Sequence, residues 1–240
     1  MAVSLAACSS TSTPQADPKE AAAIIAKSNS AMQAAGSVAY VVKASLKPTT
    51  ANPHPVVETL TAEVSAPAAA ESIRFSNGQG ALDVIFVNNV AYVRGNIATM
   101  EQALGMSAQT APFYAGQWIS VQPSDTPFKA ISESLTLTSQ IQAFIPQGKK
   151  VTVSNVTING HSLAALTGPA TPNASITSGV TRVYISNATS LPTTAGVVGA
   201  TKRGETQEIA TFRSWGKKVN LTAPTPSVAL SSTFQTPPAG

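Results

Sequence analysis

The chain has 240 residues and a mass of 24.5 kDa, enough for one large domain or two small ones. Only 11% of the residues are charged but 43% are hydrophobic, which excludes intrinsic disorder for most of the length, and no apolar run approaches the ~20 residues of a membrane-spanning helix. The formal net charge is +4, but no run of Lys and Arg exceeds two residues and aromatic residues are few, so nucleic-acid binding is not expected.

The only cysteine of the chain, Cys8, lies in a short motif near the N-terminus. It follows Leu5-Ala6-Ala7 and precedes a Ser/Thr-rich stretch over residues 9–16. This order resembles a bacterial lipobox, in which the cysteine thiol is acylated and the preceding segment is removed. We therefore predict Cys8 as a lipid-attachment residue; the alternative is a chance cysteine in a disordered terminus. Because only seven residues precede it, we expect the start of the secretion signal to be missing.

A helix is predicted to follow the Ser/Thr-rich stretch. Asp17 is a good N-cap, Pro18 suits the first helical position, and Glu20 completes a capping box. Gly36 is a suitable residue just past its C-terminal end. One weakly apolar stripe at helical spacing consists of Ala21, Ile24, Ile25, Ser28 and Met32.

The hydrophobic period changes to two at Ser37, which indicates β-strands. Short strands separated by Asn/Gly turns at 8–12-residue spacing favour an antiparallel meander. The strands that we expect before the middle of the chain are 37–46, 56–65, 71–76, 81–87 and 90–94. Those expected after it are 151–158, 161–166, 180–186, 193–201 and 206–214, with an Asn159-Gly160 hairpin turn.

Between the two sets of strands the sequence predicts a helical insert. Its expected helices are 97–104, 126–134 and 138–145, with a brief strand over 117–121 between the first two. A sheet of nine to eleven antiparallel strands twists and curls strongly, so the helices can pack on its concave face. The predicted fold is thus α+β: a half-barrel with an N-terminal helix and a helical plug. We expect a tether over 1–16, a single domain over 17–228 and a flexible C-terminal tail over 229–240.

This order of elements resembles the LolA-like bacterial lipoproteins, and within them the actinobacterial lipid carriers of the LppX and LprG type. The resemblance covers about residues 17–228 and rests on the lipobox at Cys8 and on the segments 84–87, 91–94, 116–121, 211–216 and 219–224. It implies an apolar cavity between sheet and helices that holds acylated lipids or glycolipids. Because LolA-like relatives include periplasmic stress sensors, it also implies that an envelope protein is an alternative partner.

Burial of acyl chains needs no catalytic group, ion or cofactor. A chain of ~16 carbons gains on the order of 13 kcal/mol from burial of its methylene groups. The residues that we predict to line the cavity are Leu46, Ile85, Val87, Leu104, Phe113, Phe128, Leu135 and Phe144. The alternative for each is ordinary core packing, because a periodic apolar face is first of all a core.

Side chains suited to catalysis are few in this sequence, and we predict no catalytic residue, no metal site and no cofactor. His54 lies between two prolines, and His161 begins a strand without a carboxylate at metal-ligand spacing. Ser214 and Lys217 match an S-x-x-K string but lack the companion motifs of that chemistry. The sequence between residues 182 and 218 contains six Lys or Arg residues but only two glutamates. These cations could attract anionic headgroups or a membrane surface, or merely protect a sheet edge.

The leading hypothesis is a non-enzymatic lipoprotein, anchored to the membrane on the outer face of an actinobacterial cytoplasmic membrane. It would bind lipid or glycolipid for transport or presentation in the cell envelope. The alternative is an envelope protein-interaction or stress-sensing module without lipid cargo, which predicts a filled core and an exposed apolar patch. A hydrolase would require a polar cleft with converging titratable groups.

Overall fold

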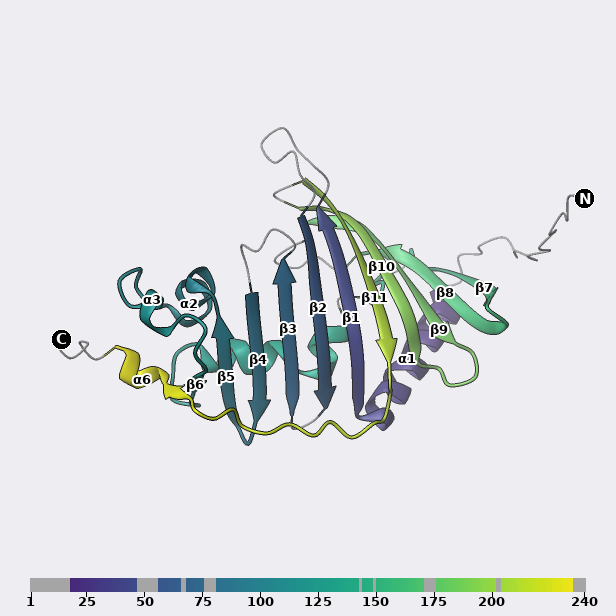
Figure 1. Ribbon diagram of the computed structural model, residues 1–240. Helices are drawn as coiled ribbons and strands as arrows, with labels where there is room; N and C mark the ends of the chain where they lie inside the picture. The colour runs from purple at the N-terminus through teal and green to yellow at the C-terminus, as the bar shows by residue number, and fades with distance from the viewer. Residues whose placement is uncertain are drawn as a thin grey trace, which may run out of the picture.

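The computed structural model describes residues 18–46, 56–65, 68–75, 81–142, 144–148, 150–170, 176–201 and 204–234. In this part of the chain a single curved sheet carries helices on its concave face (Figure 1). The strands are β1 Ser37–Leu46, β2 Val56–Ser65, β3 Ala69–Phe75, β4 Ala81–Val87, β5 Val90–Gly95, β6 Ile119–Val121, β7 Thr152–Ile158, β8 His161–Pro169, β9 Ser178–Ser186, β10 Pro192–Thr201, β11 Gly204–Arg213 and β12 Val228–Ala229. The helices are α1 Pro18–Ala35, α2 Ile97–Leu104, α3 Ala111–Tyr114, α4 Phe128–Ser134, α5 Leu137–Gln142 and α6 Leu230–Thr233.

The N-terminal helix α1 confirms the prediction from its apolar stripe. Ala21, Ser28 and Met32 are buried, and the helix ends before Gly36, whose φ of +68° suits a residue without a side chain. Cys8 and the whole tether over 1–16 lie outside the described residues.

The sheet has twelve strands in the order β12-β6-β5-β4-β3-β2-β1-β11-β10-β9-β8-β7. Strands β1 to β5 and strands β7 to β11 form two antiparallel meanders, and β1 joins them by pairing with both β2 and β11. The prediction of nine to eleven antiparallel strands is corrected in one respect: the added strand β12 pairs in parallel with β6, so the sheet is mixed. The curved, unclosed half-barrel with its helices is confirmed.

The two-residue turns between strands follow from their sequence. Asn88 and Asn89 join β4 to β5 with φ of +54° and +61°, and Asn159 and Gly160 join β7 to β8 with φ of +51° and +78°. These are the left-handed conformations that a tight hairpin turn requires and that Asn and Gly adopt most readily.

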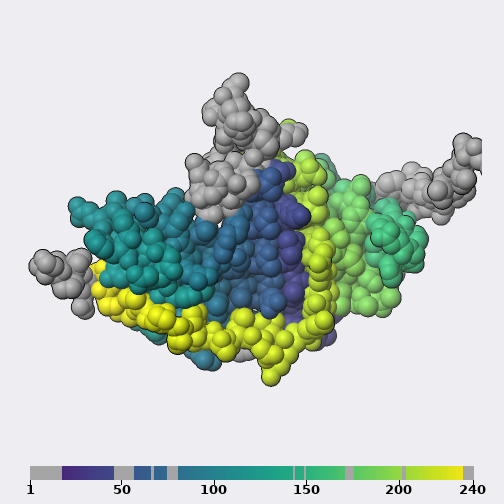
Figure 2. Space-filling view, in the orientation of Figure 1, coloured from purple at the N-terminus to yellow at the C-terminus, as the bar shows by residue number. Residues whose placement is uncertain are grey.

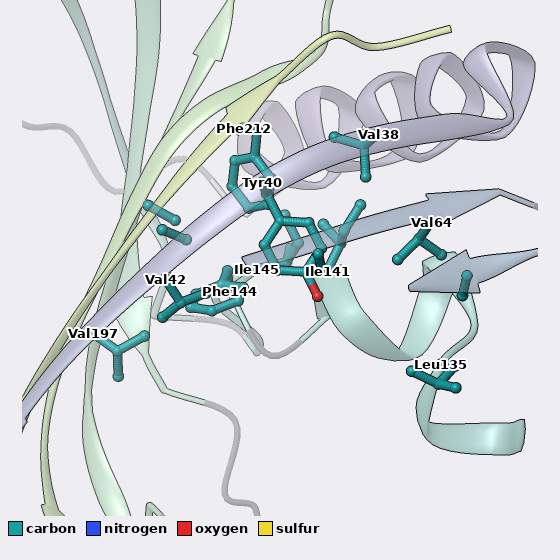
Figure 3. Close-up of a cluster of buried hydrophobic side chains, with 14 of the residues drawn as sticks. Val38, Tyr40, Val42, Val64, Leu135, Ile141, Phe144, Ile145, Val197 and Phe212 are labelled. Atoms are coloured by element: carbon teal, nitrogen blue, oxygen red, sulfur yellow. The ribbon is translucent and has the colours of Figure 1, made fainter. Parts of the chain in front are cut away.

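Strand alternation divides the side chains between two faces of the sheet. On β1, the inward-facing Val38, Tyr40 and Val42 are buried, whereas Val41 and Lys43 point outward. Antiparallel partners share a face, so the inward set continues through β11 with Phe212 and its neighbours. Figure 3 shows Tyr40 and Phe212 directed toward the α5 region that covers them.

The helical insert lies on the concave face, where α4 and α5 cross behind the central strands in Figure 1. The observed α2 has the predicted bounds; it is capped by Asn96, whose side chain accepts a hydrogen bond from the Thr99 amide at 3.1 Å. α4 and α5 are shorter than predicted, and the one-turn α3 was not predicted. We call α4 and α5 together the roof.

The C-terminal segment crosses the lower ends of the strands before it joins the far edge of the sheet, as the yellow atoms of Figure 2 show. It begins at β1, where the Ser37 hydroxyl donates to the Lys217 carbonyl at 2.6 Å, and reaches β6, where the Val228 amide donates to the Trp118 carbonyl. Leu230 is then buried in the core. Residues 228–233 therefore pack against the sheet, although we predicted a flexible tail from residue 229 onward. The reason is that Leu230 buries its apolar side chain at the edge of the sheet.

Candidate functional site

The inner face of the sheet is not covered evenly by the helices. On β2, β3 and β4, the cross-strand neighbours Leu60, Ile73 and Leu82 point inward but are only half-buried. We call these three residues the strip. Two residues further along the same face, Ala62 on β2 and Val84 on β4 are buried. The strip thus continues the apolar core along β2, β3 and β4 with side chains that are partly exposed.

Three carboxylates also point into the concave side. Glu58 on β2 and Glu208 on β11 are the partners of Ala44 on either side of β1, and Glu71 on β3 is the partner of Ala62. Burial raises the pKa of all three carboxyl groups, and the charge of Glu58 raises those of Glu71 and Glu208 further.

The side chain of Gln140 on α5 connects the roof to two strands. Its Nε2 donates to Glu71 Oε2 at 3.0 Å, and its Oε1 accepts a hydrogen bond from the Tyr40 hydroxyl. Burial and the neighbouring Glu71 charge raise the pKa of Tyr40, so this phenol stays protonated as a donor. Gln140 therefore links α5 to the sheet beside the strip.

Under the roof, aromatic and aliphatic side chains fill the space. The Phe144 ring meets the Phe212 ring edge-on at a centroid distance of 6.0 Å, and Ile141 is buried beside them (Figure 3). A cavity of about 90 Å³ lies between α1 and α5, lined by Met32, Leu137 and their neighbours. Pockets for small ligands usually measure about 300–1,000 Å³, so an acyl chain would have to displace the roof.

Five of the eight predicted lining residues lie on the core side of the sheet or outside the description. Leu104, Leu135 and Phe144 are buried in the core, and Phe128 of α4 is half-buried against Phe86, with ring centroids 6.1 Å apart. The side chain of Leu46 lies outside the described residues.

The other three predicted lining residues do not join them. Val84 and Phe86 point inward, so alternation turns Ile85 and Val87 to the opposite face. Phe113 on α3 is 65% exposed. The apolar run 84–87 gave no sign of which residues point inward, because every residue in it is apolar.

A shallow groove of about 310 Å³ crosses the convex face over β2 to β5. Asp83 lies in it and accepts hydrogen bonds from Arg74 at 2.6 Å and Arg94 at 2.9 Å; the Arg94 guanidinium lies 4.5 Å from the Trp118 ring centroid. Burial alone would raise the pKa of Asp83, but these bonds and one from Ser72 lower it overall. The groove is held together by its own ion pairs.

The inward carboxylates were missed by the sequence analysis, although a signal existed. Glu58 has the same parity along β2 as Leu60, Ala62 and Val64, so an inward direction could have been inferred from alternation. Glu208 has the same parity as Ala210 and Phe212 on β11 in the same way.

Other residues considered from the sequence are scattered. His161 is exposed, and His54 lies outside the described residues. Ser214 and Lys217 belong to an exposed turn in which the Lys217 amide donates to the Ser214 carbonyl. The described residues contain no group of three His, Cys, Asp or Glu placed to hold a metal ion, and none of their helices has the length and apolar character to cross a membrane.

The clustered cations do not form one rim over the described residues. Arg182 and Arg213 point to the convex face, where Arg182 Nε donates to the Thr167 hydroxyl at 2.9 Å. Lys217 and Lys218 are exposed in the segment after β11, and residues 202–203 lie outside the description.

No protein-family model matches the sequence, and no curated protein matches it. Among solved structures, the lipoprotein LppX of Mycobacterium tuberculosis is 15% identical, with 86% of this chain and 100% of that chain covered and a TM-score of 0.49. A LolA superfamily protein of Nitrosomonas europaea is 9% identical, with 83% and 94% covered and a TM-score of 0.34. MucB in its complex with MucA from Pseudomonas aeruginosa is 12% identical, with 80% and 55% covered and a TM-score of 0.34. The likeness of this chain to these three solved structures concerns the fold alone.

Proposed function

We propose that this protein binds the acyl chains of a lipid or glycolipid between the inner face of the sheet and the roof. The observation that carries the proposal is the strip: Leu60, Ile73 and Leu82 form a half-buried apolar surface, in which Leu60 and Leu82 pack against the core and Ile73 lies between them. Each such side chain gains on the order of 25 cal/mol for every Å² of apolar surface that a ligand covers, so an acyl chain is a fitting occupant.

Entry of an acyl chain requires the roof to move away from the sheet. α4 has no buried side chain and α5 buries only Ile141, so the roof is weakly held for elements that cover a core. The ligand would replace the contacts that Ile141 and Phe144 now make, with Gln140 as the polar link that must be released.

The proposed role is that of a non-enzymatic carrier or presenting protein. Acylation of Cys8 would hold it at the outer face of the cytoplasmic membrane, with the Ser/Thr-rich stretch over 9–16 as a tether. One acyl chain gives only marginal membrane binding, so anchoring would depend on a second lipid signal or chain at the same cysteine.

The test is titration of the purified protein with a fluorescent fatty acid, followed by mass spectrometry of lipids that copurify from a membrane-containing host. Ile73→Asp places a charge in the strip and should weaken fatty-acid binding by at least about tenfold. Ile158→Asp, on an outward position of β7 that is already 41% exposed, is the matched control and should bind normally. Equal binding by both variants, or no bound lipid at all, would overturn the proposal.

A second candidate function is an interaction module without lipid cargo. It is favoured by three exposed aliphatic side chains on the convex face: Val180 and Val198, which are cross-strand partners, and Ile209 on β11. The two functions differ in hydrogen exchange. A fatty acid should change the exchange rates of the roof amides if the protein is a carrier, and should leave them unchanged if the core stays closed.

A further inference from the structure

The convex face of the sheet carries its charged side chains unevenly. Over β2 to β5, the convex positions hold the cations Arg74 and Arg94 and the carboxylates Glu63 and Asp83, so these charges balance. Both arginines also bind Asp83 directly. The balance is lost over the other half of the face, which is formed by β1, β9, β10 and β11.

These four strands carry a surplus of positive charge on their convex face. Their described convex positions hold three cations, Lys43, Arg182 and Arg213, and one carboxylate, Glu205. All four side chains belong to exposed residues. An anionic surface that approaches the convex face is therefore attracted to this half of the sheet more strongly than to the half over β2 to β5.

Strand pairing places two of the three cations at the ends of one cross-strand row. Lys43 on β1 pairs with Ile209 on β11. Ile209 pairs with Gly196 on β10, which in turn pairs with Arg182 on β9. Three steps of about 4.8 Å between neighbouring strands separate the two cations by about 14 Å along the row. The row thus has a cation at each end and an aliphatic side chain between them.

Exposed aliphatic side chains gather around this row. Ile209 is 45% exposed, and in the neighbouring row the cross-strand partners Val180 and Val198 are 52% and 54% exposed. Figure 2 shows that no helix covers the central strands on this side of the molecule. We call Lys43, Arg182, Val180, Val198 and Ile209 the convex patch. Exposed apolar side chains rimmed by charged ones are typical of a surface that contacts a partner.

The charge and the size of the convex patch restrict what can cover it. A second copy of this chain, seated face to face, would bring the cations of both copies together, and like charges oppose that contact. Two rows about 7 Å apart over four strands cover roughly 300 Å², whereas a stable protein interface buries about 800 Å² on each partner. The patch therefore suits an anionic surface that needs no large complementary area.

We propose that the convex patch contacts the anionic headgroups of a lipid bilayer. This inference rests on the proposed function, because acylation of Cys8 would keep the patch near a membrane. One acyl chain holds a protein only marginally, and a basic surface is one of the second signals that make its attachment stable. The aliphatic stems of Lys43 and Arg182 can lie beside the valines while their charged ends reach the lipid phosphates.

Contact through the convex patch also determines which way the carrier faces. The helices lie on the concave face, opposite the patch (Figure 1). The strip and the roof would then point away from the bilayer. Such an orientation suits presentation of a bound lipid to another protein in the envelope.

The experiment measures cosedimentation of the full chain with lipid vesicles, with the substitution Cys8→Ser so that no acyl chain contributes. The vesicles contain either phosphatidylcholine alone or equal amounts of phosphatidylcholine and phosphatidylglycerol. The chain should bind the anionic vesicles at least about tenfold more tightly, since each cation near an anionic bilayer contributes about fivefold. Salt at about 0.5 M should abolish the difference. Equal affinity for both kinds of vesicle, or binding to neither, would overturn the proposal.

Charge variants locate the contact. Lys43→Gln with Arg182→Gln should bring the affinity for anionic vesicles to within about threefold of that for phosphatidylcholine vesicles. Lys27→Gln with Lys129→Gln is the matched control, because it removes the same charge from exposed positions on α1 and α4 and should bind like the parent chain. Equal losses in both double variants would show that net charge alone acts, and would overturn the convex patch.

An aliphatic variant tests the rest of the patch. Val198→Ser with Ile209→Ser leaves the charge unchanged and should weaken binding to the anionic vesicles at least about threefold, because less apolar surface is covered. Unchanged binding would overturn the assignment of these side chains to the contact.

The fatty-acid titration separates this inference from the carrier function. Normal fatty-acid binding by a chain without preference for anionic vesicles would overturn the convex patch alone. Binding to anionic vesicles by a chain that takes up no fatty acid would support the patch and overturn the carrier function.

Discussion

Single residues of this sheet show how the same side-chain type behaves differently on its two faces. Asp83 on the convex face has three partners, Arg74, Arg94 and Ser72, which offset the effect of its burial. Glu58 on the concave face has no such partner among the described residues, and burial raises its pKa. Acidic side chains of similar burial thus have pKa values shifted in opposite directions, according to the donors that each face supplies.

Asp83→Asn is expected to lower the free energy of unfolding by about 1–2 kcal/mol. The variant loses two ion pairs, which are partly screened because the arginine side chains are 50% and 43% exposed. Urea unfolding at neutral pH measures the change. Glu133→Gln, which breaks only the exposed pair with Lys129, should change it by less than about 0.5 kcal/mol. Equal losses in both variants would show that Asp83 is not held as the structure indicates.

The free energy of unfolding should fall as the pH rises above 4.5. The carboxyls of Glu58, Glu71 and Glu208 have pKa values raised from 4.5, so above that pH the folded state binds more protons than the unfolded state. Their contribution is complete below pH 4.5 and is lost as pH passes through the folded-state values. Urea unfolding between about pH 4.5 and 8 tests this. The triple Glu→Gln variant should show a flatter profile; an unchanged slope would contradict it. The pKa of Asp83 is lowered from 3.8, so its contribution to the free energy of unfolding has the opposite pH dependence: it is lost as the pH falls below 3.8.

At the scale of secondary-structure elements, short segments complete the core. β12 and α6 together comprise residues 228–233, yet they add a parallel strand beside β6 and bury Leu230 and Thr233. The roof is the converse case: α4 and α5 together are longer, but Ile141 is the one residue that these two helices bury. The number of side chains that an element buries, more than its length, decides how strongly it is held.

Leu230→Ala is expected to destabilise the protein by about 2–3 kcal/mol. The side chain is 1% exposed, so its truncation removes buried methyl groups and leaves a cavity at the sheet edge. Thermal or urea unfolding measures the loss. Val180→Ala on the convex face, where the side chain is 52% exposed, is the control and should change stability by less than about 0.5 kcal/mol. A similar effect of both would mean that the C-terminal segment does not pack as described.

At the scale of the whole molecule, the sheet is open and its two faces differ. The concave face carries the core, the strip and the inward carboxylates, and the convex face carries the exposed cations and valines. An unclosed sheet can change its curvature and admit a ligand without breaking strand pairing, provided that the helices on its concave face move.

Hydrogen exchange should show that the roof is more mobile than the central strands of the sheet. We expect amides of α5 to exchange at least roughly tenfold faster than those of β1, which is paired on both sides with β2 and β11. Gln140→Ala should speed exchange in α5 further, because it removes the bonds to Tyr40 and Glu71. Equal protection of α5 and β1 would indicate a rigid roof and would count against entry of a ligand beneath it.

The sequence by itself determined those features that depend on near neighbours. The caps and stripe of 18–35, the period-two pattern of β1 and the Asn88-Asn89 and Asn159-Gly160 turns each follow from residues a few positions apart. Because these signals are local, element type and most boundaries could be predicted, and with them the curved α+β half-barrel.

Only the tertiary structure decided which face became the interior. Alternation fixes that Ile85 and Val84 point to opposite sides, but only the packing of the folded chain determines that Val84 is buried in the core. The parallel pairing of Val228 with Ile119 is equally non-local. Contacts between residues far apart in sequence leave no trace in local periodicity, so the placement of Glu58, Glu71 and Glu208 on neighbouring strands around β1 and β2 became visible only when the strands were paired.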